Sequence, residues 1–349
     1  MKRTWLSAMF SRFQTYTGRE TMKHLSLLVV LVISVLLTAD HAPAQSPANY
    51  PTRSIRMIVP FAPGGASDFG ARIIQPKLSE VLGKQVVIDN RAGAAGNVGV
   101  DLVARAIPDG YTILNGNVGT MAINPSVFPE FPIKPLRDLI GVTAVTDVPG
   151  GLAIHPSIPA NTIQEFVAYA KARPGKLNYG SAGASSSTRL AFEFLMAKSG
   201  INLAHVPYKG GAGAATIALI SGEVQAAFAS VASFIPHLKT GKLKLIGVMF
   251  DKRLPSLPNT PTLIESGFPE LTTGSWQCIH VPAGTPRPIV DKLYSALSKV
   301  MQDPWVIDRL TAGGAVPFTN KSPEDFTVFL KSQNEFWGKL VKQLGITEN

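Results

Sequence analysis

The sequence has almost no cysteine. Its single cysteine, Cys278, excludes an internal disulfide framework. Because Cys278 lies in the apolar run WQCIHV, we expect it to be a buried small hydrophobic residue rather than a reactive thiol. No cysteine stands directly after the apolar N-terminal segment, so we do not expect a bacterial lipoprotein anchor.

Signatures of several enzyme and metal classes are also missing. Residues 180–183 do not form the G-x-S-x-G turn of a hydrolase, and residues 211–216 lack the third glycine of a dinucleotide site. There is no H-E-x-x-H pattern and no P-loop lysine. Beyond the N-terminal segment, four histidines lie far apart and are expected at surface or hydrogen-bonded core positions: 155, 205, 237 and 280. We therefore expect no catalytic residues, no metal and no cofactor.

Long hydrophobic runs are rare, and the one at Leu25–Ala39 spans only 15 residues. Basic residues precede it and the small-x-small sequence 42–44 follows it, which predicts a secretory signal peptide over residues 1–44. Met22 is an alternative start, and an uncleaved membrane anchor is the alternative interpretation. We expect an exported, periplasmic protein.

Charged residues make up only 16% of the chain, although the net charge is +10. The basic residues are scattered and do not alternate with aromatic residues, so a nucleic acid partner is not expected. The positive balance favours an anionic partner only weakly.

The pattern that is present is an alternation of short apolar runs and helical periods. Residues 55–61, 85–90 and 111–116 are typical of strands, and residues 71–82 and 99–106 of helices. This alternation predicts parallel strands joined by crossover helices, an α/β fold.

The rest of the chain repeats this alternation in a second region. Residues 139–156 hold two β-rich runs broken at 149–151. Further expected elements are a helix at 162–175, a strand and helix in 176–200, a strand, helix and strand in 201–230, a strand at 243–250, and helices at 287–301, 304–313 and 323–344. We predict two α/β lobes, lobe one from residues 45–147 plus 250–349 and lobe two from residues 148–249.

The corner between the first strand and its helix, Pro60–Asp68, has the composition of an anion site. Glycines let a ligand approach the backbone, and free amides at a helix N-terminus attract a carboxylate or phosphate. The alternative is a tight turn whose amides bind water. Asp68 is expected either to cap the helix or to hold a ligand amine or bound water.

Three more glycine-rich, hydroxyl-rich loops follow expected strands, at residues 115–125, 178–189 and 206–216. In open α/β sheets such loops meet at the carboxyl ends of the strands. They predict a cleft that recognises a small anion mainly through backbone amides and hydroxyl groups.

Five segments together resemble the Bug family, the periplasmic solute-binding subunits of tripartite tricarboxylate transporters. The segments run through the chain in the family's order: 50–72, 90–114, 177–191, 206–224 and 257–271. The resemblance implies a two-lobed type II periplasmic binding fold with the ligand cleft between the lobes. It also implies a small carboxylate ligand, transporter membrane subunits as partners and no enzymatic activity, and we expect a monomer. A ligand sensor that feeds a membrane receptor and, less favoured, a secreted enzyme on the same scaffold are the alternatives.

The resemblance also implies the ligand-binding residues. A carboxylate would be held by amides around Gly64–Ala66, partly through water, with the loops of the two lobes facing each other. The expected residues are Phe61, Ala62, Pro63, Gly64, Gly65, Ala66, Asp68, Asn117, Gly119, Thr120, Ser181, Ala182, Gly183, Ser185, Ser186, Arg189, Gly210 and Gly211.

Two positions depart from the family's pattern. Arg189 stands where a histidine is usual, and it would either grip a second carboxylate or lie in solvent on its helix. Residues 227–233 lack the aspartate that often ends this strand, which favours an anionic or apolar ligand end over an amine.

Overall fold

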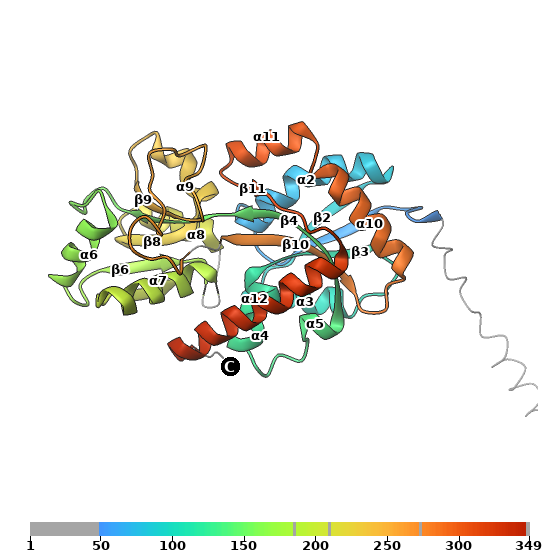
Figure 1. Ribbon diagram of the computed structural model, residues 1–349, viewed down its shortest axis with the longest axis horizontal. Coiled ribbons are helices and arrows are strands. Elements are labelled where there is room, and N and C mark those ends of the chain that lie inside the picture. The colour runs from blue at the N-terminus through green and yellow to red at the C-terminus, as the bar shows by residue number, and fades with distance from the viewer. Residues whose placement is uncertain (1–48, 184–185, 209–210, 272–273, 347–349) are drawn as a thin grey trace, which may run out of the picture. The chain divides into compact units, whose positions relative to one another are not determined.

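Two β-sheets, between which the chain crosses, organise the fold (Figure 1). The computed structural model describes residues 49–183, 186–208, 211–271 and 274–346. The predicted signal peptide therefore lies outside the described residues.

Within these ranges the first sheet has six strands in the order β11-β4-β10-β3-β1-β2. Their bounds are β1 (Ile55–Val59), β2 (Val86–Asn90), β3 (Thr112–Asn117), β4 (Leu139–Val148), β10 (Ser275–Pro282) and β11 (Val316–Pro317). Strand β1 pairs in parallel with β2 and β3, which confirms the predicted parallel arrangement, whereas β10 runs antiparallel to β3 and β4.

The helices that connect or flank this sheet are α2 (Ala66–Leu82), α3 (Asn97–Ala104), α4 (Asn124–Val127), α5 (Pro135–Asp138), α10 (Arg287–Val300), α11 (Pro304–Ala312) and α12 (Pro323–Leu344), with a 3₁₀ turn at Ala94–Gly96 and a π-helix at Gly119–Ile123. Side chains cap two of them: Asp303 caps α11, and Ser322 caps α12 by accepting a hydrogen bond from the amide of Asp325.

The second sheet has five strands in the described part of the chain, in the order β7-β6-β8-β5-β9. Its elements are β5 (Gly150–Ile154), α6 (Ile163–Lys171), β6 (Asn178–Ser181), α7 (Ser187–Ser199), β7 (Ala204–Pro207), α8 (Gly211–Ile220), β8 (Ala226–Ser230), α9 (Val231–Leu238) and β9 (Lys244–Met249). Strand β6 is parallel to β7 and β8, and β5 is antiparallel to β8 and β9.

The chain passes between the sheets at two places. Strand β4 ends one residue before β5 begins, and β9 is followed by a long connection to β10. These crossings lie near the predicted lobe boundaries at 147/148 and 249/250. The lobes themselves stay a prediction, because sheet membership does not define which parts move together.

Each sheet has its own buried core. Ile74, Ile113 and Leu297 belong to a cluster on the first sheet, and Phe166 and Phe192 belong to one on the second. Leu190 of α7 is buried in the same cluster as Trp337 of α12, so α12 links the two regions. No helix among the described residues is both long and apolar enough to span a membrane.

Strand β10 and helix α9 were not predicted. Strand β10 lies between β3 and β4, and both of its faces are covered, so it shows no alternation of apolar and polar residues. Helix α9 begins directly after β8, with no loop residue to mark the change. Cys278 on β10 is buried, as predicted.

Candidate ligand-binding site

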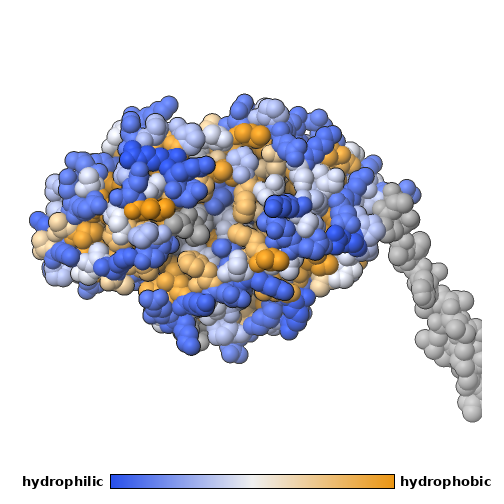
Figure 2. Space-filling view, viewed as in Figure 1, coloured by the Kyte–Doolittle hydropathy of each residue, from blue (hydrophilic) through white to orange (hydrophobic). Residues whose placement is uncertain are grey.

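A cavity of about 700 Å³ lies among loops that follow strands of both sheets. Its described lining is Phe61, Ala62, Gly65, Ala66, Ser67, Ala92, Gly93, Ala94, Ala95, Gly96, Asn117, Val118, Gly119, Phe128, Ala182, Gly183, Ser186, Ser187, Thr188, Pro207, Gly211, Ala212, Ser230 and Ser275. On the face shown in Figure 2, hydrophilic residues cover most of the surface, and hydrophobic residues show in patches near its middle. The volume is typical of sites that bury a small organic ligand, roughly 300–1,000 Å³.

The first wall is the corner between β1 and α2. Gly65 is the N-cap of this helix, in extended conformation, and no side chain caps the helix there. The first amides of a helix have no acceptor within it, and the helix dipole adds partial positive charge. Gly65, Ala66 and Ser67 line the cavity, so these donors lie at its surface.

Asp68 fixes the shape of this corner. Its carboxylate accepts hydrogen bonds from the Gly64 amide (3.0 Å), Arg72 Nε (2.8 Å) and Asn90 Nδ2 (3.0 Å). Burial acts to raise the pKa of Asp68, but these hydrogen bonds together lower it below its usual value. Asp68 therefore stays charged and holds the loop, and it does not line the cavity.

A polar cluster supports the floor of the cavity between α2 and β3. Ser67 Oγ donates to Gln277 Oε1 at 2.6 Å and accepts from Asn117 Nδ2 at 3.2 Å. The Asn117 and Thr120 side chains each accept a hydrogen bond from the other's amide at 3.0 Å. Thr120 thus orients Asn117 from behind and does not itself reach the cavity.

The loop from β2 to α3 forms a second part of this wall. Four consecutive residues have positive φ: Gly93 (143°), Ala94 (44°), Ala95 (54°) and Gly96 (94°). Gly96 is required, because a Cβ there would lie 2.5 Å from Thr120 Cγ2 and 3.0 Å from the ring of Phe61. All four residues line the cavity.

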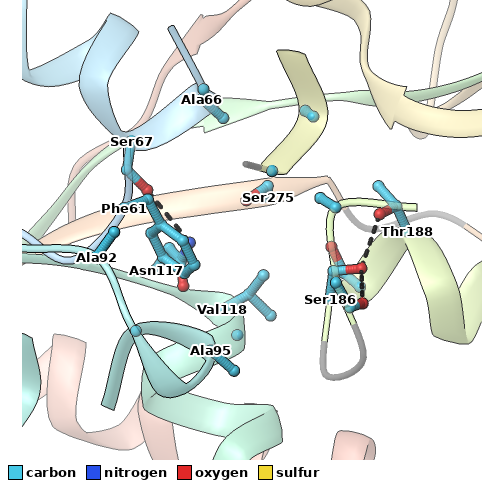
Figure 3. A pocket seen from close by; sticks show the side chains of 18 of the residues that line it. Phe61, Ala66, Ser67, Ala92, Ala95, Asn117, Val118, Ser186, Thr188 and Ser275 are labelled. Carbon is cyan, nitrogen blue, oxygen red and sulfur yellow. Dashed lines mark hydrogen bonds between the residues drawn. The ribbon is translucent and has the colours of Figure 1, made fainter. Parts of the chain in front are cut away.

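The opposite wall comes from the second sheet. Ser186 caps α7 by accepting the Arg189 amide at 3.2 Å, and its hydroxyl donates to the Gly183 carbonyl at 2.8 Å. Figure 3 shows Ser186 and Thr188 on this side, across from Phe61, Ala95 and Val118. The hydroxyls of Ser186 and Thr188 lie 3.0 Å apart.

Arg189 fits neither sequence interpretation closely. Its side chain is 17% exposed and lies 3.7 Å from Glu193, which also accepts a hydrogen bond from the Tyr179 hydroxyl at 2.7 Å. It is not among the residues that line the cavity. A role in ligand binding stays a prediction.

The described lining of the cavity carries no charged side chain. Charged residues that adjoin the lining have acidic or basic neighbours: Asp68 pairs with Arg72, Arg91 pairs with Asp89 at 2.9 Å, and Arg189 lies 3.7 Å from Glu193. No group of three or more His, Cys, Asp and Glu side chains within the described ranges could hold a metal ion. The donors available to a ligand are amides, hydroxyls and one side-chain amide.

The structure brings ten of the eighteen predicted residues to the cavity: Phe61, Ala62, Gly65, Ala66, Asn117, Gly119, Ala182, Gly183, Ser186 and Gly211. Those that do not line it are Pro63, Gly64, Asp68, Thr120, Ser181 and Arg189. Ser185 and Gly210 lie outside the described residues. Ligand contact by any of them stays a prediction.

Ser181 is set back from the cavity and has a clear structural role. Ser181 Oγ lies 2.8 Å from His205 Nε2 and accepts the Gly183 amide at 3.3 Å, so it is directed into the second sheet's loop. Pro63 and Gly64 are exposed at the tip of their loop.

Sequence reasoning missed the whole loop at 92–96, together with Ser67, Val118, Phe128, Ser187, Thr188, Pro207, Ala212, Ser230 and Ser275. The loop carries the same signal as the predicted corners, because residues 86–90, 91–96 and 97–104 form strand, glycine-rich loop and helix. Phe128 and Ser275 lack such a signal, since Phe128 directly follows α4 and Ser275 begins β10, and neither lies in a glycine-rich corner.

The histidine prediction was wrong for one residue. Both ring nitrogens of His280 are buried and have no hydrogen-bond partner among the described residues, and burial lowers its pKa to about 3. It packs against the ring of Phe326 at 5.4 Å between centroids. Burial, with a smaller contribution from Arg189, lowers the pKa of His205 to about 4, so both histidines are neutral at pH 7.

A comparison with known families decides the identity. Residues 70–346 match the tripartite tricarboxylate transporter family receptor. The chain belongs to this receptor family. The protein BugT of Bordetella pertussis is 32% identical over 323 residues, which cover 92% of this chain and 98% of BugT. The resemblance found in the sequence is confirmed.

Solved structures of relatives confirm the receptor fold. The periplasmic binding protein BugD is 34% identical, with a TM-score of 0.81 over 86% of this chain and 100% of BugD. The Rhodopseudomonas palustris protein Rpa4515, solved with adipate, is 32% identical, with a TM-score of 0.82 over 86% of this chain and 99% of its own. The predicted α/β periplasmic binding fold is correct, and these family relatives are binding proteins rather than enzymes.

Proposed function

We propose that this receptor captures a small organic acid, a di- or tricarboxylate or a related acid, in the cavity between the two sheets. The observation that carries the proposal is the open N-terminus of α2, whose uncapped amides line the cavity at Gly65–Ser67. Adipate in the related Rpa4515 structure is an acid of this class.

We further propose that the protein performs no chemistry on its ligand and passes it to transporter membrane subunits. A ligand that contacts both walls stabilises a closed form by its differential affinity for that form. Export with removal of residues 1–44, a periplasmic location and a monomeric state belong to this proposal. The intact mass of the exported protein tests the cleavage, and its mass in solution tests the monomer.

A thermal-shift screen of residues 45–349 against mono-, di- and tricarboxylates, acidic amino acids and aromatic acids tests the ligand class. An acid at about 100 times its Kd adds about 2.7 kcal/mol of stability, which raises the melting temperature. If no acid of the panel raises the melting temperature of protein shown to be folded and ligand-free, the proposal is contradicted.

Gly65→Val tests the position of the acid. The backbone at Gly65 is extended (φ −85°, ψ 176°) and the space around an added Cβ is open, so valine fits the fold and projects toward the cavity. We expect at least a tenfold loss of affinity for the acid found in the screen. Ala172→Val, at the exposed end of α6, is the matched control and should bind normally. Unchanged affinity in Gly65→Val removes this corner from the site.

A further inference from the structure

Many side chains on the cavity wall that belongs to the first sheet are apolar, although Ser67, Asn117 and Ser275 line the same wall. Phe61, Val118 and Phe128 line it, together with the methyl groups of Ala92, Ala94 and Ala95. Figure 3 shows Phe61, Ala92, Ala95 and Val118 together on this side. These apolar side chains supply contact area and no hydrogen bonds.

Ala94 and Ala95 have a strained backbone conformation. Both residues have left-handed backbone, with φ of 44° and 54°. This conformation is unfavourable for any residue with a Cβ, whereas glycine adopts it freely and asparagine adopts it more readily than alanine. Strain of this kind gathers at functional sites. Two methyl groups therefore stand in the cavity wall where glycine would relieve the backbone.

The described lining of the cavity offers no charged partner for a second carboxylate. Nearby Asp68 and Arg91 are paired with Arg72 and Asp89, and Arg189, directly after the lining residue Thr188, lies 3.7 Å from Glu193. A charge taken from water without a paired partner is costly, so each further carboxylate would have to rely on neutral donors alone. A ligand with one carboxylate at α2 and an apolar remainder meets no such cost.

We infer that the preferred ligand is an organic acid with an apolar body, an aliphatic chain or aromatic ring, whose body packs on the wall formed by Phe61, Ala92, Ala94, Ala95, Val118 and Phe128. This inference rests on the proposed function, because it assumes that the carboxylate binds at α2. The inference predicts that compact hydroxylated acids such as malate and citrate bind more weakly than an acid with an apolar body.

Titration calorimetry with acetate, butyrate, hexanoate, benzoate, malate and citrate tests the inference. Affinity should rise about fourfold for each methylene buried, from acetate toward hexanoate. Benzoate and hexanoate should bind at least tenfold more tightly than malate and citrate. Equal or tighter binding of malate or citrate overturns the inference and leaves the proposed function standing. Absence of binding by all six acids overturns the inference, and the wider thermal-shift screen then decides the proposed function.

Two variants of Ala95 test whether the body of the ligand contacts this wall. Ala95→Asn keeps a residue that tolerates positive φ but places an amide in the wall, and it should weaken hexanoate at least tenfold and acetate, which has the shortest body, by less. Ala95→Gly, the matched control, removes one methyl group and should weaken hexanoate about fourfold. Both variants should fold, as circular dichroism would check. Equal hexanoate affinity in all three proteins shows that this wall does not contact the body and overturns the inference.

Discussion

Asp147 is a carboxylate whose burial should destabilise the protein at neutral pH. It lies on β4 next to the crossing into the second sheet, paired in register with Trp276 and Val316. Its Oδ1 is buried and has no hydrogen-bond partner among the described residues. Gly274 packs so closely that a Cβ there would lie 2.2 Å from this oxygen. Burial, and then the negative charge of Asp251, raise the pKa of Asp147 to about 7, although a hydrogen bond from the Gly274 backbone opposes the shift.

The raised pKa of Asp147 determines how the unfolding free energy changes with pH. The folded state holds the proton of Asp147 up to about pH 7, whereas the unfolded chain loses it near 3.8. The unfolding free energy should therefore fall as pH rises between these values and then stay level. A gap of about three pKa units corresponds to at most about 4 kcal/mol at 1.36 kcal/mol per unit. Because the residue as a whole is only half-buried, we expect about 1–3 kcal/mol.

Asp147→Asn removes this penalty. Urea denaturation from pH 4.5 to 8.5 should show the variant more stable than the natural protein by about 1–3 kcal/mol at pH 8, with the difference shrinking toward pH 4.5. Asp251→Asn, at an exposed neighbour, is the control, and it should raise the stability at pH 8 by a smaller amount than Asp147→Asn. The reasoning would be refuted if the unfolding free energies of the natural protein and Asp147→Asn changed in parallel with pH, or if the variant were the less stable protein at pH 8.

Three further substitutions test other contacts. Gly99→Ala should lower the unfolding free energy by about 1–3 kcal/mol, since the new Cβ would lie 2.8 Å from Pro60 Cβ; a melting temperature equal to the natural one would contradict this packing. Asp303→Ala should cost about 1 kcal/mol in the same assay, because its carboxylate caps α11 by accepting two amides; an unchanged value would mean that the cap is replaced by water. Arg189→Ala should weaken binding of the acid in calorimetry, either directly or by releasing Glu193, and unchanged affinity would remove Arg189 from the site.

Local patterns in the sequence predicted local structure well. The run from β1 into α2 was recognisable because an apolar strand, a glycine corner and a helical period follow one another within residues 55–82. The helix nevertheless begins at Ala66, five residues before the predicted start at Ala71, because the small and polar residues of its first turn give no apolar period.

Contacts between distant segments could not be predicted in this way. The position of Asp68 depends on Asn90, which reaches it from the end of another strand. The described lining of the cavity is uncharged and the nearby Asp68 and Arg91 form ion pairs, whereas a sequence shows the charges without their partners. The left-handed backbone of Ala94 and Ala95 was equally hidden, since alanine is not a residue that signals positive φ.

The single cysteine offers a means of observing the two sheets move. Cys278 is buried in the centre of the first sheet, and burial raises the pKa of its thiol well above the usual value, so it should resist alkylation in the folded protein. Fluorophores could then be attached to cysteines introduced at exposed positions, such as Lys292→Cys on α10 and Ala172→Cys beside α6, without replacing the natural residue. Energy transfer between the two dyes would report in real time whether an added acid draws the sheets together.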